Sequence, residues 1–170
     1  MPVASRAKAS LMLRILFFDA LLIMCCGYAL ARGGPPERII SGALLAAYAA
    51  TVASYSDLAE RFYQLEVGTF VVDVTLLLVL VAVALRADRG WPLLLAGLQL
   101  DSVGAHVLKY FDLPMIRVTY ALMIAVWSYP MLVALAIGTW RHRQRFKALG
   151  YDRAWTGRGI MEVGPPSPGH

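Results

Sequence analysis

The chain has 170 residues, of which 59% are hydrophobic and only 16% are charged, and its mean hydropathy is +0.60. Soluble globular domains are about 45 to 50% apolar and about a quarter charged, so this composition excludes an ordinary soluble domain. The net charge of +5 comes mostly from the C-terminal end, without the interleaved aromatic and basic residues of a nucleic-acid site. The composition therefore predicts an integral membrane protein.

Five apolar runs approach the roughly 20 residues that a helix needs to cross the hydrocarbon core. They cover residues 11–31, 39–55, 67–85, 91–110 and 115–140, and short polar or Gly- and Pro-containing breaks separate them. A basic segment, residues 1–10, precedes the first run. Residues 141–170 form a basic and then Pro- and Gly-rich tail, which we expect to be cytoplasmic and partly disordered. We predict an all-α, polytopic transmembrane bundle in which residues 11–140 form one domain of five helices.

The distribution of lysine and arginine leaves a four-helix alternative open. These residues are enriched on the cytoplasmic side of membrane proteins, and both ends of the chain are basic. Two cytoplasmic ends require an even number of spans. Five spans with a cytoplasmic C-terminus place ten cations inside and six outside, and a fourth run that dips in without crossing also leaves an excess of cations inside. We favour five spans and leave the side of the N-terminus open.

The first run raises the question of cleavage. Ala29-Leu30-Ala31 has the small-x-small form that precedes a signal-peptide cleavage site, but Asp19 inside the run argues against a signal peptide. We expect an uncleaved helix. The two cysteines of the chain, Cys25 and Cys26, are adjacent in this run, which excludes a disulfide framework and indicates a packing role.

The second run carries a stripe of small residues. Gly42, Ala46, Ala50 and Ser54 recur at every fourth position and fall on one face of a helix, where they permit close approach of a neighbouring helix. We expect this stripe to be a packing face inside the bundle. A contact between two copies of the chain is the alternative.

The fourth run contains most of the candidate site. Gln99, Ser102 and His106 fall within one narrow helical stripe, and Asp101 points in nearly the opposite direction. The stripe must face other helices or water, because lipid cannot satisfy polar groups. Together with Asp73 of the third run, these four residues form the predicted intramembrane polar site. They either hold helices together by hydrogen bonds or line a proton or ligand path, since histidine changes charge in the physiological pH range.

Signatures of other chemistries are missing from the sequence. His106 is the only histidine inside an apolar run, so we expect no metal and no cofactor, and no zinc, serine-hydrolase or phosphate-loop motif occurs. The remaining predicted contact is with anionic lipid headgroups, through Arg141, Arg143, Arg145 and Lys147.

The prediction for function is correspondingly general. We expect a small, non-enzymatic protein of a bacterial-type inner membrane that acts as an accessory or self-associating component. Its partners would be the lipid bilayer, a second copy or another membrane protein, and not nucleic acid. The alternative is a small proton- or solute-conducting carrier or channel that uses the polar stripe of the fourth run. The biological process and any substrate are not predicted.

Overall fold

The computed structural model describes residues 2–56, 62–87, 89–110 and 117–149, and in this part of the chain it contains five helices and no strand. The helices are α1 (Pro2–Arg32), α2 (Pro35–Ser56), α3 (Phe62–Arg86), α4 (Trp91–Tyr110) and α5 (Arg117–Leu149). The all-α prediction is confirmed. The five helices follow the order of the five predicted apolar runs, but α1 begins before the first run and α5 continues past the last one. The C-terminal segment after residue 149, for which we predicted partial disorder, lies outside the described residues.

The break between α1 and α2 shows why the helices end where they do. The backbone N–H of Gly33 still reaches the carbonyl of Ala29, whereas the carbonyl of Gly34 accepts the first hydrogen bond of α2 from Arg38. Two prolines then open α2, at positions where a missing N–H and a fixed φ do no harm. The chain therefore reverses direction within two residues.

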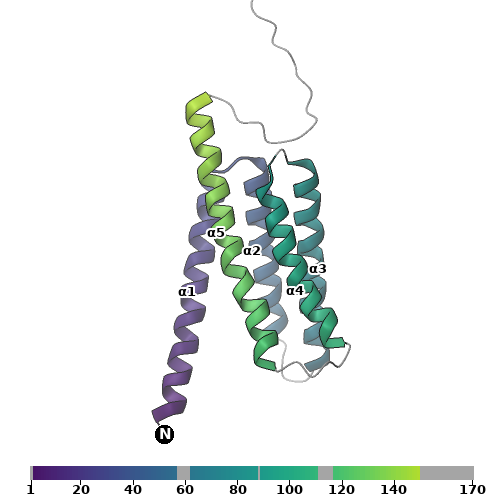
Figure 1. Ribbon diagram of the computed structural model, residues 1–170. Coiled ribbons are helices and arrows are strands. Elements are labelled where there is room, and N and C mark those ends of the chain that lie inside the picture. Colours follow the sequence, from purple (N-terminus) through teal and green to yellow (C-terminus); the bar gives the residue numbers. More distant parts are fainter. Residues whose placement is uncertain (1, 57–61, 88, 111–116, 150–170) are drawn as a thin grey trace, which may run out of the picture.

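The five helices form a ring of neighbours in chain order. Each helix packs against the next one, α5 packs against α1, and α2 and α5 also touch. Successive helices run in opposite directions, so the α1–α2 connection, the α3–α4 connection and the C-terminal end of α5 lie at the same end of the bundle (Figure 1). We call this the loop end. Toward its N-terminus, α1 leans away from the other helices (Figure 1).

Among the described side chains, an apolar core occupies the part of the bundle that is nearer the loop end. Every helix contributes to it, and its most deeply buried members are Cys26, Ala29, Ile40, Leu80, Leu95, Leu132 and Leu135. Cys25 and Cys26 belong to this core as free thiols, as the packing prediction requires.

The outer surface of the bundle is also apolar. Exposed large apolar side chains occur on all five helices, among them Leu16, Leu78, Leu94 and Ile137. Among the described residues, two helices combine the length and composition needed to cross a bilayer, α1 over Met12–Arg32 and α3 over Val67–Arg86. Only 17% of the α3 span is buried inside the bundle, whereas a core helix of a soluble protein would be mostly buried. Both helices are compatible with membrane association.

The small-residue stripe of α2 lies elsewhere than predicted. Gly42, Ala46 and Ala50 are exposed on the outside of the bundle, and a Cβ atom added to Gly42 would meet nothing within 4 Å. The side chain of Ser54 lies outside the described part. The expected packing face inside the bundle is therefore wrong for these three residues, because other residues of α2, including Ile40 and Leu44, face the core.

Candidate functional site: two polar clusters

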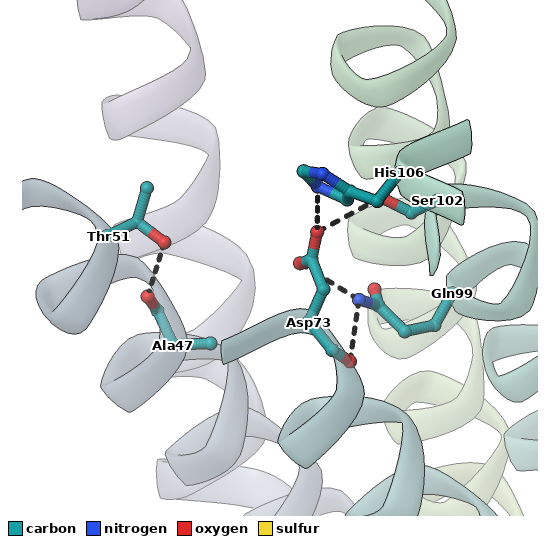
Figure 2. A network of polar contacts seen from close by, with 6 residues as sticks. All are labelled: Ala47, Thr51, Asp73, Gln99, Ser102 and His106. Atoms are coloured by element: carbon teal, nitrogen blue, oxygen red, sulfur yellow. Dashed lines mark hydrogen bonds and ion pairs between the residues drawn. The ribbon is translucent and has the colours of Figure 1, made fainter. Parts of the chain in front are cut away.

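A carboxylate on α3 gathers three polar side chains of α4. Asp73 Oδ1 accepts a hydrogen bond from Gln99 Nε2 at 3.0 Å, and its Oδ2 lies 3.0 Å from His106 Nε2 and 3.4 Å from Ser102 Oγ. Gln99 also donates to the backbone carbonyl of Asp73 at 3.2 Å. Figure 2 shows Asp73 pointing from α3 toward all three side chains. We call Asp73, Gln99, Ser102 and His106 the carboxylate cluster.

The cluster is largely shielded from solvent. Gln99, Ser102 and His106 are 4 to 7% exposed, and the side chain of Asp73 is 22% exposed. The ring of Phe70 lies edge-on to His106, with centroids 5.9 Å apart. The polar stripe of α4 therefore faces the neighbouring helix α3, one of the two environments that we left open for it.

The geometry of the carboxylate cluster indicates what it can do chemically. An ionised carboxylate only accepts hydrogen bonds, so the 3.0 Å contact requires a hydrogen on Nε2 of His106 when Asp73 is ionised. Ser102 bonds to the same oxygen and not to the imidazole, so the three residues lack the serine-to-histidine contact of a hydrolase triad. The cluster can bind α3 to α4, or hold a proton between a carboxylate and an imidazole.

One predicted site residue does not join this cluster. Asp101 is exposed on the opposite side of α4, as the helical spacing of this residue indicated. The predicted lipid-contact residues Arg141, Arg143, Arg145 and Lys147 stand on the last turns of α5, which continues past the apolar run to Leu149.

A second polar cluster, at the loop end, was not predicted from sequence. Arg89 of the α3–α4 connection forms an ion pair with Glu37 in the first turn of α2, and its Nη2 lies 3.2 Å from Nδ1 of His142 on α5. The side chains of Glu37 and Arg89 are 0% and 2% exposed. We call Glu37, Arg89 and His142 the arginine cluster. The only sequence signal for it was a set of isolated charges at the breaks between apolar runs.

Two close approaches position the arginine cluster. A Cβ atom at Gly34 would lie 3.0 Å from Cε1 of His142 and 3.1 Å from Oε2 of Glu37, so the α1–α2 connection packs against α5. A Cβ atom at Gly138 would lie 2.7 Å from the indole of Trp91, so the start of α4 also packs against α5. Arginine only donates hydrogen bonds, so the contact with Arg89 requires an unprotonated Nδ1 on His142.

A third polar contact joins α1 to α2. The hydroxyl of Tyr48 donates to Oδ1 of Asp19 at 2.5 Å, and the rings of Phe18, Tyr48 and Tyr129 pack around it. Asp19, one of the ionisable residues inside an apolar run, therefore has a specific hydrogen-bond partner.

Comparison with family models, with curated proteins and with solved structures finds no significant match for this chain. No group of three or more histidine, cysteine or acidic side chains within the described residues is placed to hold a metal ion. The function is therefore argued from the geometry of this chain alone.

Proposed function

We propose that this chain is a non-enzymatic membrane protein that crosses the bilayer five times and acts as a self-associating component of a membrane assembly. The observation that carries self-association is the exposed small-residue stripe of α2. The five-span arrangement rests on the apolar outer surface and on the distribution of charge.

The membrane placement is supported by a distribution of apolar and polar side chains that is opposite to that of a soluble bundle. Large apolar side chains such as Leu13, Leu85 and Leu93 are more than 60% exposed, whereas Gln99 and His106 are buried. Removing apolar surface from water stabilises a protein by about 25 cal/mol per Å². Exposing two dozen large apolar side chains to water would therefore be strongly unfavourable. Lipid removes this penalty.

The alternation of the helices supports five spans over four. The 20 residues of α4 extend for about 30 Å at 1.5 Å per residue, which matches the hydrocarbon core. The four loop arginines Arg32, Arg38, Arg86 and Arg89 share the loop end with the basic residues of α5. This is the charge distribution that the five-span topology assigns to the cytoplasmic side.

The outward stripe of α2 supports contact with a second copy. Gly42, Ala46 and Ala50 follow the small-xxx-small pattern that lets two membrane helices approach closely, and no side chain of the described bundle covers Gly42. Ala46 and Ala50 of the stripe also line an apolar groove of about 290 Å³ between α2 and α3, whose α3 side includes Val72 and Val79. A helix from another copy fits against such a face.

Cysteine cross-linking in native membranes tests self-association. On a Cys25→Ser, Cys26→Ser background, Ala46→Cys should form a disulfide-linked dimer, and adding Gly42→Ile should abolish it by preventing close approach. Gly27→Ile is the matched control, because Gly27 is also a helical glycine with no atom within 4 Å of its Cβ position.

Random collision gives a different result. If Met24→Cys, at an exposed position of α1, cross-links as efficiently as Ala46→Cys, the contact is not specific and self-association through α2 is refuted. Topology is read separately from Gln144→Cys on the exposed surface of α5, which an impermeant thiol reagent should label only from the cytoplasmic side.

The carboxylate cluster supports a second candidate function, a proton-accepting site. Its specific observation is a partly exposed carboxylate beside an imidazole, with Asp73 Oδ2 3.0 Å from His106 Nε2. Leu80, Leu95 and Leu132 occupy the core between this cluster and the loop end. Because these apolar side chains fill that space, we expect a site that is reached from one side of the bundle, and not a channel that runs through it.

Accessibility distinguishes this candidate from simple helix packing. Single cysteines at positions 102 and 106, on the same cysteine-free background, are treated with an impermeant thiol reagent in intact and opened cells. Labelling at both positions supports a water-accessible site and shows its side. Protection at both positions would mean that Ser102 and His106 serve to hold α4 to α3 through their contacts with Asp73, at about 0.6 kcal/mol per bond.

A further inference from the structure

The loop end carries a concentration of exposed positive charge drawn from three segments of the chain. Arg32 and Arg38 flank the α1–α2 connection, Arg86 ends α3, and the last turns of α5 carry four more cations. Of these seven, six are exposed and Arg143 is half-exposed. We call these seven side chains the cationic end.

The acidic group that the structure describes at this end does not neutralise the cationic end. Glu37 is the one acidic side chain described there, and it is wholly buried in an ion pair with Arg89. The negative charge is thus matched inside the bundle by an arginine that is itself 2% exposed. Glu37 therefore contributes no free negative charge to the cationic end.

The cationic end is also held in place. Arg38 donates through Nε to the carbonyl of Gly33 at 3.1 Å, and the adjacent Gly34 packs against His142. Arg38 and Arg141 therefore belong to one packed unit, although 103 residues separate them in the sequence. From His142 to Lys147 the helix rises about 7.5 Å, comparable with the headgroup layer on one side of a bilayer. Trp140 and Phe146, both 55% exposed, provide apolar contacts for this layer.

We infer that the cationic end is a composite site for the headgroups of anionic phospholipids, in which Arg38 of α2 and Arg141 of α5 act on the same lipid layer. Cations near an anionic surface gain about 1 kcal/mol each, or about fivefold in lipid preference. This inference rests on the proposed membrane placement, which the Gln144→Cys labelling tests independently. If the protein inserts into purely zwitterionic bilayers but shows no preference for anionic lipid, the membrane placement stands and only the inference about the cationic end fails.

The test measures which lipid the full chain retains. The protein is placed in nanodiscs of phosphatidylcholine and phosphatidylglycerol, and the ratio of the two lipids released with it into detergent is determined by native mass spectrometry. The wild type should be enriched in phosphatidylglycerol. Arg38→Gln and Arg141→Gln should each reduce the enrichment in phosphatidylglycerol up to about fivefold, and their effects should combine in the double variant. Arg38→Lys, which keeps the charge, should retain most of the enrichment.

Arg14→Gln is the matched control, since Arg14 is exposed on α1 away from the loop end. An equal loss in this variant would show that net charge alone sets lipid preference and would overturn the inference. An unchanged ratio in Arg38→Gln beside a reduced ratio in Arg141→Gln would assign binding to α5 alone and overturn the composite site. Competition by free inorganic phosphate at millimolar concentration would point to a soluble anion as the ligand and would also overturn it.

Discussion

The buried ion pair between Glu37 and Arg89 gives the sharpest quantitative prediction. Glu37→Gln keeps the shape of the side chain but removes its charge, leaving a guanidinium that is 2% exposed without its counter-charge. Breaking a buried pair from one side costs about 3 to 5 kcal/mol, a large part of the 5 to 15 kcal/mol that stabilises a typical protein. Replacing both partners with methionine removes both charges, so Glu37→Met with Arg89→Met should lie near the wild type in stability.

The assay is equilibrium unfolding in mixed micelles, followed by tryptophan fluorescence. We expect a strong interaction between the two substitutions in a double-mutant cycle. Gln144→Ala is the control, because this exposed side chain beyond the apolar run of α5 should change stability by no more than about 0.5 kcal/mol. If Glu37→Gln costs less than about 1 kcal/mol, as exposed ion pairs do, the pair is solvated and the reasoning fails.

Three further predictions use the same unfolding assay or thiol labelling. Gly138→Ala should lower the free energy of unfolding by about 1 to 3 kcal/mol, because its Cβ would lie 2.7 Å from the rigid indole of Trp91. Gly42→Ala meets open space and should be neutral or slightly stabilising. Equal effects of the two substitutions would contradict this packing. Tyr48→Phe should cost about 1 kcal/mol by removing the donor to the carboxylate on α1, and no cost would mean that water replaces this bond. The thiol of Cys26, 0% exposed, should react with maleimide only on unfolding, so rapid labelling of the folded protein would place it outside the core.

The order of the helices was predictable because an apolar run marks each of them, but their ends were not: α1 begins at Pro2 and α5 continues to Leu149, beyond the apolar runs. The carboxylate cluster was also within reach, since Gln99, Ser102 and His106 share a face of one helix by spacing. Asp73 and Asp101 were both candidate partners of His106, and the structure selects Asp73 because Asp101 points away. Periodicity shows which residues share one face of a helix, and this was sufficient to predict the α4 members of the carboxylate cluster.

The arginine cluster and the position of the α2 stripe were not predictable in this way. Glu37, Arg89 and His142 come from three segments more than 50 residues apart, and only tertiary packing brings them together. Likewise, the spacing of Gly42 and Ala46 shows that they share a face, but it cannot show which helix, if any, covers that face. The missing information in both cases is the order of helices around the bundle.

The ring of helices has a consequence for biogenesis. Contacts between α1 and α2, α2 and α3, and α3 and α4 join neighbours in the sequence, so each can form as the corresponding hairpin emerges from the ribosome. The contact between α1 and α5 spans nearly the whole chain and must wait for the final helix. Glu37 and Arg89 are already synthesised by then, and His142 arrives last. Docking of α5 is therefore the step that completes both the ring and its polar end, and a chain truncated before α5 is expected to stay open and to be a substrate for membrane quality-control proteases.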